Sequence, residues 1–396
     1  MDQAQRESFF FKEDEMKRTG LVMAALGLFL FAQSAQAQWT SARRLTWNSG
    51  RSEYPAIAID SADTIHVVWD DYPFSITEIY YKRSTDGGAT WSTAKTLAWT
   101  SGQSVRPAIA IDSTDAIHVV WQDSSPGNHE IYYKSSKDGG VTWSATQNLT
   151  STLGGSMSPT VAIGSGDSVH VVWQDSTPGN WEIHYKRSTD GGTTWGGARR
   201  LTWTDGESLN PAIASGDNTH VVWEEEESGN YEIYYKRSTD GGTTWGTAKR
   251  LTWTSAGSFA PAIAMGTSGQ VHVAWSDDAP GNDEIYYRRS TDGGATWSAA
   301  RRLTWTTGGS FVPTIAVDSS DQVHIAWHDD TSGDNEIYYK MSTDGGTTWS
   351  AAIRLAKLTG QSEYPAMAID TGDIIHVVWQ DDTDGGLPEI YYSNNK

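Results

Sequence analysis

The distribution of apolar and polar residues repeats along the chain with a period of about 52 residues. In the first complete unit, short runs rich in β-branched and aromatic residues occupy positions 55–60, 65–71, 78–84 and 91–99. Gly, Asp and Ser residues separate these runs, as turns between strands require. Each unit therefore predicts four short β-strands.

The unit occurs seven times, because a proline opens its first predicted strand at positions 55, 107, 159, 211, 261, 313 and 365. The seventh unit ends after its third strand, and residues 39–47 match the missing fourth strand. Four-stranded units repeated around a ring make a β-propeller. We therefore predict an all-β, seven-bladed β-propeller whose last blade is completed by the N-terminal strand, which leaves no open sheet edge.

The first 37 residues differ from the repeats. Lys17 and Arg18 precede an apolar run at positions 21–31, and Ala35-Gln36-Ala37 follows it. This order is typical of a secretory signal peptide, and the apolar run is too short to span a bilayer. We predict a signal peptide at residues 1–37, with Met16 as a possible true start, and a propeller domain at residues 38–396. The expected location is secreted, periplasmic or on the cell surface, with no membrane span in the mature protein.

Charge narrows the range of partners. The formal net charge is −20, and removal of residues 1–37 takes away four basic and five acidic residues, which leaves −20 + 1 = −19. Such a body repels nucleic acid and anionic membrane surfaces. With no cysteine in the chain, stability must come from packing. We expect a monomer without a cofactor, and the candidate partners are a glycan or an extracellular protein.

A nonapeptide between the third and fourth predicted strands is written six times, in two copies as Arg-Ser-Thr-Asp-Gly-Gly-Thr-Thr-Trp. Its pattern S-x-D-x-G-x-T-W resembles the Asp-box of the sialidase-like BNR-repeat propeller superfamily, and the resemblance extends over residues 38–396. The box also occurs in sialidases, other glycosidases, sortilin-like receptors and non-enzymatic proteins. Asp-Gly-Gly suits a tight hairpin, and the Trp can wedge between sheets, so we expect a structural role. The box aspartates are Asp86, Asp138, Asp190, Asp240, Asp292 and Asp344.

Other side chains also recur seven-fold. Each second strand carries a histidine and ends on an acidic residue, and each third strand opens with a glutamate; His66, Asp71 and Glu78 are the first set. Seven imidazoles could suggest a metal ring, but we expect hydrogen bonds within or between blades and no metal. The paired carboxylates could act as an acid and a base, although seven identical pairs favour loop fastening. The turn Asp60–Asp63 suits calcium or an Asx-turn, and we favour the turn.

A site that is specific for one ligand must be formed by residues that differ between the seven units. Every loop between blades ends in Ser-x-x-Pro, and the two middle residues vary. These pairs should surround the mouth of the central channel, with variable second-to-third-strand loops beside them. We centre the predicted site on the junction of the seventh and first units, where the pair Glu-Tyr occurs twice. The candidate ligand-binding residues are Arg51, Glu53, Tyr54, Arg106, Glu363, Tyr364, Trp181 and Tyr231.

The resemblance raises the possibility of sialidase activity. Sialidases hold a sugar carboxylate with three arginines, the first in an (F/Y)RIP motif, and use a Tyr–Glu nucleophile and an Asp acid/base. Only Arg51 and Arg106 lie in the loops between blades, and Arg106 directly precedes its proline instead of standing two residues before it. The catalytic set cannot be assembled, so catalytic residues stay unknown. We expect a secreted, non-catalytic propeller that binds carbohydrate through the loops between blades. The alternatives are a glycoside hydrolase and a protein-binding or structural propeller.

Overall fold

A computed structural model of the protein describes residues 38–73, 75–227, 229–383 and 386–396. Thr40–Asn394 forms one compact unit, which contains every strand. The predicted signal peptide lies outside the described residues. Within those residues, no helix is long and apolar enough to cross a bilayer.

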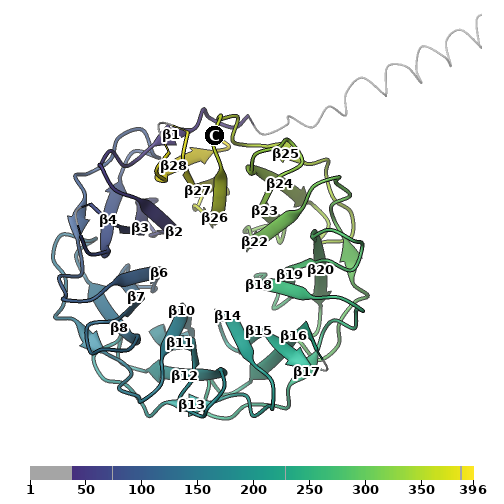
Figure 1. Ribbon diagram of the computed structural model, residues 1–396, viewed down its shortest axis with the longest axis horizontal. Helices are drawn as coiled ribbons and strands as arrows, with labels where there is room; N and C mark the ends of the chain where they lie inside the picture. The colour runs from purple at the N-terminus through teal and green to yellow at the C-terminus, as the bar shows by residue number, and fades with distance from the viewer. Residues whose placement is uncertain (1–37, 74, 228, 384–385) are drawn as a thin grey trace, which may run out of the picture. The chain divides into compact units, whose positions relative to one another are not determined.

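Seven four-stranded antiparallel sheets form the blades, and each blade presents its first strand to the centre of the ring (Figure 1). The first strands of blades 1 to 7 are β2 (Ser52–Ile59), β6 (Ser104–Ile111), β10 (Ser156–Gly164), β14 (Ser208–Ser215), β18 (Ser258–Met265), β22 (Ser310–Val317) and β26 (Ser362–Ile369). The second strands are β3 (Ile65–Asp71), β7 (Ile117–Asp123), β11 (Ser168–Asp175), β15 (Thr219–Glu227), β19 (Val271–Asp277), β23 (Val323–Asp329) and β27 (Ile375–Asp381). A 3-10 turn, η1 (Ser165–Asp167), joins β10 to β11.

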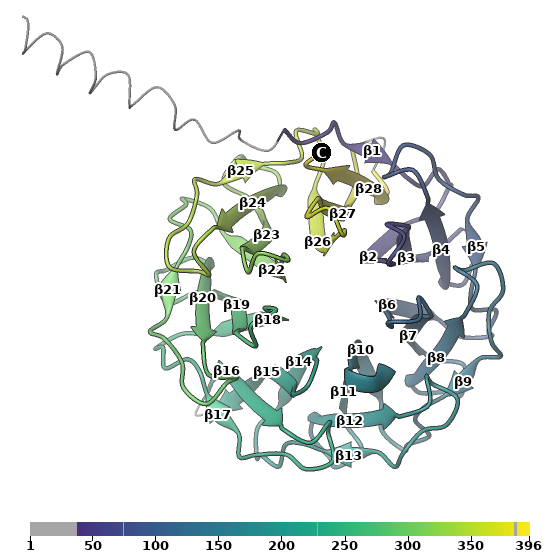
Figure 2. The same ribbon diagram turned by 180° about the vertical axis from the view of Figure 1, so that it is seen from behind.

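The third and fourth strands lie progressively further out (Figure 2). The third strands are β4 (Glu78–Ser84), β8 (Glu130–Ser136), β12 (Glu182–Ser188), β16 (Asn230–Ser238), β20 (Glu284–Ser290), β24 (Glu336–Ser342) and β28 (Glu389–Asn394). The fourth strands are β5 (Lys95–Thr96), β9 (Gln147–Asn148), β13 (Arg199–Arg200), β17 (Lys249–Arg250), β21 (Arg301–Arg302), β25 (Ile353–Arg354) and, in blade 7, β1 (Arg43–Arg44).

The predicted closure of the ring is confirmed. β1 pairs antiparallel with β28, so the sheet of blade 7 has the order β1-β28-β27-β26. The backbone N–H of Leu45 donates to the carbonyl of Ile390 at 2.7 Å, and the Leu45 side chain is buried beside Trp69 and Ile390. The N-terminal segment therefore completes the last blade with both backbone and core contacts.

The fourth strands are much shorter than the pattern predicts. In blade 1 only Lys95 and Thr96 pair with the third strand, whereas the apolar pattern extends over residues 91–99. An outermost strand has a neighbour on one side only, and its first residues are exposed and polar, so little holds them in register. Outside this pair, the backbone N–H groups of Ser92 and Leu97 donate to the carbonyls of Arg83 (2.9 Å) and Ile79 (2.7 Å) of the third strand.

The hydrophobic cores lie between neighbouring blades. One cluster joins Val68 and Tyr81 of blade 1 to Ile117, Val119 and Trp121 of blade 2. The second-strand Trp of every blade is fully buried. Each fully buried Trp removes about 200 Å² from water, worth up to about 5 kcal/mol at 25 cal/mol/Å². Packing between blades therefore holds a cysteine-free ring together.

The Asp-boxes connect each blade to its neighbour. The box ring Trp195 meets Tyr133 of the preceding blade edge to face, with ring centroids 5.0 Å apart. Trp195 is only partly buried, unlike the second-strand tryptophans. Gly192 has φ +80°, and a Cβ there would lie 1.8 Å from the Tyr133 hydroxyl. The second glycine of the box is thus required both by its backbone conformation and by the tyrosine packed against it.

Hydrogen bonds inside the box hold the turn in shape. The buried Ser188 accepts the N–H of Gly192 at 2.9 Å and donates to the Asp190 carboxylate at 2.7 Å. Asp190 is exposed and accepts the backbone N–H and hydroxyl of Thr194 at 2.8 and 2.6 Å. These hydrogen bonds lower the pKa of Asp190 to about 2. The Asp190 carboxylate accepts hydrogen bonds from its own turn, as expected for a structural role.

Candidate functional site at the channel mouth

A β-bulge interrupts the first strand of every blade. In blade 1 the pairing of β2 with β3 shifts register between Glu53 and Ala56, and Tyr54 and Pro55 lie in the interruption. Tyr54 has φ +49°, in the left-handed region that non-glycine residues seldom occupy. A bulge re-aims the side chain it carries, and bulges are common beside functional sites.

All seven bulge residues adopt this left-handed conformation, with φ between +46° and +54°. Asn is the residue of this set that tolerates left-handed backbone best, yet only blade 4 has Asn. A β-branched Val occupies the position in blade 6, where the strain is largest. The bulge residues of blades 1 to 7 are Tyr54, Arg106, Ser158, Asn210, Ala260, Val312 and Tyr364.

A buried side chain of the preceding blade stabilises the bulge at six of the seven junctions. The residue after the second-strand Trp accepts the backbone N–H of the next blade's bulge residue. Sequence reasoning missed these acceptors, although a polar residue after every second-strand Trp was a visible signal. The pairs are Asp70 with Arg106 (2.9 Å), Gln122 with Ser158 (2.8 Å), Gln174 with Asn210 (2.9 Å), Ser276 with Val312 (3.1 Å), Gln380 with Tyr54 (3.1 Å) and Glu224 with Ala260.

The junction of blades 6 and 7 differs from the other six. His328 occupies the acceptor position, and its ring lies 5.7 Å from that of Tyr364 and 5.6 Å from that of Phe311. Its Nδ1 is buried and has no partner among the described residues. Burial lowers the pKa of His328 to about 4, so the ring is neutral at pH 7. An aromatic cluster replaces the hydrogen bond at this junction.

The bulge residues and the prolines that follow them line a central cavity of about 470 Å³. This volume lies within the usual range for sites that hold small molecules. Of the described residues that line it, Arg106 alone carries a charged side chain. The second member of each variable pair therefore faces the channel, while Glu53, Glu363 and the other first members stand outside the lining.

Three of the eight predicted site residues meet in the cavity. The rings of Tyr54 and Tyr364 lie 4.8 Å apart at an angle of 57°, and the Arg106 guanidinium lies 4.8 Å over the Tyr54 ring. Burial raises the pKa of Tyr364 to about 12, so its phenol stays protonated. One wall of the cavity thus combines two aromatic rings, two hydroxyl groups and a cation, and the other blades contribute the uncharged bulge residues Ser158, Asn210, Ala260 and Val312.

Three further predicted residues adjoin the cavity. The exposed Arg51 lies 4.0 Å from Glu53, and Glu363 accepts from the Asn335 amide at 2.8 Å. Burial raises the pKa of Glu53, the Arg51 charge lowers it, and the nearby Glu363 charge raises it. These carboxylates are therefore close enough to influence each other electrostatically.

Trp181 and Tyr231 do not line the central cavity. Tyr231 packs against Phe259, with ring centroids 5.7 Å apart, and its hydroxyl donates to Glu207 at 3.4 Å. Trp181 lies beside Gly155 of a loop between blades. The structure does not bring these two side chains together with Tyr54, Tyr364 and Arg106.

The histidines form the predicted hydrogen bonds. Nδ1 of His66 lies 2.7 Å from the Tyr81 hydroxyl, which also donates to Gly139 of the next Asp-box at 3.3 Å. Nε2 of His66 lies 3.2 Å from Asp60. The expectation of a histidine bonded within or between blades is confirmed, and both partners of His66 belong to its own blade. Among the described residues, no group of three or more His, Cys, Asp or Glu side chains is arranged to hold a metal ion.

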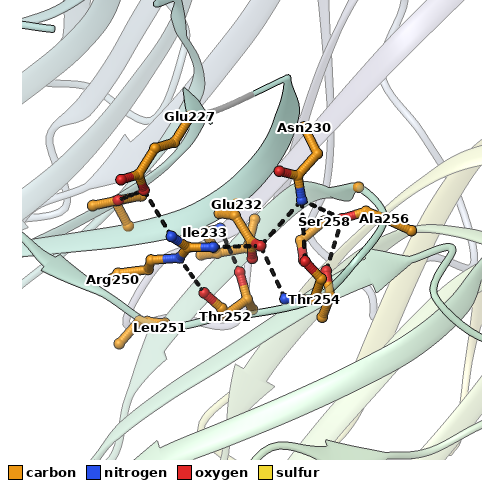
Figure 3. Close-up of polar contacts among 12 residues, drawn as sticks. Glu227, Asn230, Glu232, Ile233, Arg250, Leu251, Thr252, Thr254, Ala256 and Ser258 are labelled. Atoms are coloured by element: carbon orange, nitrogen blue, oxygen red, sulfur yellow. Dashed lines mark hydrogen bonds and ion pairs between the residues drawn. The ribbon is translucent and has the colours of Figure 1, made fainter.

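The glutamate predicted to open each third strand fastens the loops, as expected, although in blade 4 the strand β16 begins two residues earlier, at Asn230. Figure 3 shows Glu232 receiving hydrogen bonds from Arg250 (2.7 Å), the backbone of Thr254 (2.9 Å) and the amide of Asn230 (3.2 Å). Glu232 is fully buried, and Arg250 also pairs with Glu227 at 2.8 Å. A carboxylate with this many partners binds the fourth strand and the following loop to the blade.

The first-hairpin turns of blades 1, 2, 6 and 7 form Asx-turns and also link neighbouring blades. Asp60 accepts the backbone N–H groups of Ala62 (3.0 Å) and Thr64 (2.7 Å). Asp115 of the next blade accepts the backbone N–H and hydroxyl of Ser61 at 2.8 and 2.7 Å. The Asx-turn interpretation is confirmed, whereas the contact between blades could not be foreseen from one unit.

A family model of the BNR repeat-like domain matches the sequence at residues 75–278 and 166–377. The chain belongs to this BNR repeat-like family. No curated protein matches its sequence.

Several solved structures share the fold of this chain at low identity. A Dyadobacter fermentans protein of unknown function is 13% identical with a TM-score of 0.58, covering 90% of this chain and 98% of its own. The intramolecular trans-sialidase of Ruminococcus gnavus, solved with oseltamivir carboxylate, is 15% identical with a TM-score of 0.51, covering 89% and 96%. The α-L-arabinanase of Penicillium chrysogenum, solved with arabinobiose, is 16% identical with a TM-score of 0.51, covering 74% and 92%. These similarities establish the architecture of this BNR repeat-like protein.

Proposed function

We propose that this protein is a secreted, non-catalytic propeller that binds a small acidic sugar at its channel mouth. The observation that supports this proposal is the grouping of Arg106, Tyr54 and Tyr364 in a cavity of about 470 Å³. Aromatic rings stack on the apolar faces of a sugar, hydroxyl groups bond to its hydroxyls, and a guanidinium pairs with a carboxylate. Secretion rests on the signal-type sequence of residues 1–37.

The residues at bulge positions support a binding role. Arg106 and the two tyrosines occupy left-handed backbone that Asn or Gly would adopt more easily, so the frame alone gives no reason for these side chains. Binding is favoured over hydrolysis because a glycosidase needs two carboxyl groups flanking the bond that breaks. Of the described residues that line the cavity, none carries a carboxylate.

A glycoside hydrolase is the second candidate. Glu53 and Glu363 lie beside the cavity and interact electrostatically, and the raised pKa of Glu53 suits a general acid. The trans-sialidase and the arabinanase of similar fold act on carbohydrates, which is an analogy at the level of the fold.

The test is a glycan array on residues 38–396, followed by calorimetry with glucuronate and its neutral counterpart glucose. Replacing Tyr54 and Tyr364 together by Ala should weaken glucuronate binding at least tenfold, or about 1.4 kcal/mol. Arg106→Gln should abolish the preference for glucuronate over glucose. The matched control, Phe259→Ala with Phe311→Ala, changes aromatic residues outside the lining and should have a smaller effect.

Two results would contradict the proposal. Equal effects of the two double variants would mean that the channel mouth is not the site. Hydrolysis of a fluorogenic sialoside or arabinoside that is lost in Glu53→Gln would instead establish the hydrolase.

A further inference from the structure

Five tryptophan side chains project from the outer wall of the ring, each just after a fourth strand. Their exposed fractions lie between 65% and 83%, although a soluble protein gains nothing from exposing so large an apolar ring. The residues, which we call the rim tryptophans, are Trp47, Trp99, Trp203, Trp253 and Trp305.

Cations hold four of these rings in place. Over Trp253, the Arg250 guanidinium lies at 5.9 Å and the Arg288 guanidinium of the next blade at 5.5 Å from the ring centroid. Trp47, Trp203 and Trp305 have an Arg and a Lys in the same positions at 5.3 to 6.0 Å. If the cations covered both faces of an indole ring, only its edges would be exposed. These four side chains are about two-thirds exposed, so each ring keeps one face open to solvent.

The cations are themselves fixed, which makes the rings rigid. Arg250 is bonded to the buried Glu232 (Figure 3), and Lys236 beside Trp203 donates to the carbonyl of Leu201 at 2.6 Å. A flat ring that is already immobilised loses little conformational entropy when a ligand stacks on it. The rim tryptophans therefore have the properties of binding platforms.

The rim tryptophans are not needed to close the ring. Two gaps between blades have Ser151 or Lys357 at the equivalent position, yet Leu149 and Leu355 beside them are still buried. In the gaps with a rim tryptophan, the third strand of the next blade carries a Tyr and a basic residue opposite the ring. Opposite Ser151 the Tyr is replaced by His184, and opposite Lys357 the basic residue is replaced by Ser393. Every gap with a rim tryptophan thus has both a facing Tyr and a facing basic residue, whereas each gap without one keeps only one of the two, Lys186 or Tyr391.

The five platforms fall into two runs along the wall. Trp203, Trp253 and Trp305 occupy three consecutive gaps, and Trp47 and Trp99 occupy two. Hollows of about 460 Å³ beside Trp203 and about 200 Å³ beside Trp253 adjoin the longer run. Tyr286 lines the smaller hollow and offers a hydroxyl group that can bond to a ligand hydroxyl.

We propose that Trp203, Trp253 and Trp305 bind a neutral polysaccharide chain along the outer wall. Pyranose rings present flat faces of C–H groups that stack on indole, and their hydroxyls suit the polar groups of the hollows. A polymer fits because successive platforms can bind one chain with avidity. The net charge of −20 disfavours a polyanion. The inference does not depend on the function proposed for the channel mouth.

The test uses the full chain in native gels that contain hydroxyethylcellulose, a soluble β-1,4-glucan. We expect the polymer to retard the wild-type protein and the combined Trp203→Ala, Trp253→Ala and Trp305→Ala variant to bind at least tenfold more weakly. Trp253→Ala alone should lose part of the affinity, and Trp253→Phe should recover some of that loss. The control is Leu153→Ala, which removes a fully exposed apolar side chain in a gap without a platform and should bind like the wild type.

Thermal midpoints of all variants are measured alongside, because a clamp role would lower them and the platform role leaves them unchanged. Equal retardation of the wild type and the triple variant would overturn the proposal. So would retardation by polygalacturonate or single-stranded poly(dT) without retardation by hydroxyethylcellulose, which would point to a polyanion instead.

Discussion

Asp70 provides a direct test of how the channel mouth is built. It is the group in blade 1 that accepts the backbone N–H of a bulge residue, Arg106, and the equivalent group is Gln in three other blades. Burial raises the pKa of Asp70 to about 8, the Arg106 N–H lowers it, and the charge of Glu53 raises it. The folded protein therefore holds Asp70 as a neutral acid at pH 7.

The substitution Asp70→Asn keeps the carbonyl oxygen that accepts the Arg106 N–H and removes the titration. In the unfolded chain Asp70 ionises near pH 3.8, whereas in the folded protein it ionises near pH 8. Because the folded pKa is raised, the stabilisation is fully present below pH 3.8 and is lost as the pH rises through about 8. Between these values unfolding releases one proton, so the free energy of unfolding falls by about 1.36 kcal/mol per pH unit.

From pH 5 to pH 7 the wild type should therefore lose about 2.7 kcal/mol of stability relative to Asp70→Asn. The assay is urea denaturation of both proteins at the two pH values, followed by tryptophan fluorescence. Other titrating groups, including the buried histidines, are common to both proteins and cancel in the comparison.

Gln122→Glu is the matched control for Asp70, since Gln122 accepts the N–H of the Ser158 bulge at 2.8 Å. This change should introduce at blade 2 the pH dependence that Asp70→Asn removes from blade 1. If wild type and Asp70→Asn change in parallel between pH 5 and pH 7, within about 0.5 kcal/mol, Asp70 is ionised in the folded protein and the reasoning fails.

Two further predictions concern the frame. Deleting residues 38–47 should lower the thermal midpoint sharply and expose the edge of β28, and Leu45→Ala alone should cost about 2 to 5 kcal/mol in urea denaturation; a truncated protein that melts like the parent would disprove closure by β1. Asp190→Ala should lower the thermal midpoint without changing glucuronate affinity, and Ser188→Ala should lower it further because the serine is buried; loss of binding with unchanged melting would reveal a functional Asp-box.

Much of the fold could be predicted because the same pattern of apolar and polar residues repeats in every blade. The second and third strands of blade 1 begin and end where the apolar pattern does, at Ile65–Asp71 and Glu78–Ser84. The closure of blade 7 followed from counting strands in the last repeat. A strand that is ambiguous in one repeat can be assigned from the other six. A closed ring also leaves one place for the N-terminal strand, beside the third strand of blade 7.

Packing differences between chemically similar residues could not be predicted. Trp121 of a second strand is fully buried, Trp195 of an Asp-box is partly buried, and Trp203 is mostly exposed. All three kinds of Trp recur with the same spacing of about 52 residues, so the period does not distinguish them. What separates them is the distance of each strand from the ring centre, which depends on how neighbouring blades pack together.

The arrangement of the candidate residues was predicted in part for a similar reason. Variation between repeats identified Tyr54, Tyr364 and Arg106 correctly as neighbours at the mouth, but it also included Trp181 and Tyr231, which lie elsewhere. The bulge decides between these groups, because it turns the second residue of each variable pair towards the channel. A register shift of this kind depends on the partner strand and on a hydrogen bond from the next blade.

The bonding of the bulges explains how a strained position can carry different side chains. At six junctions the preceding blade holds the backbone N–H of the bulge residue, so the conformation does not depend on the side chain attached to it. Arg, Ser, Asn, Ala and Val can then occupy the same backbone in different blades, although their preferences for it differ. The acceptor of the preceding blade specifies the bulge conformation, and the bulge side chains are left free to vary. Substitutions at Tyr54 and Arg106 should for this reason change binding at the mouth without unfolding the ring.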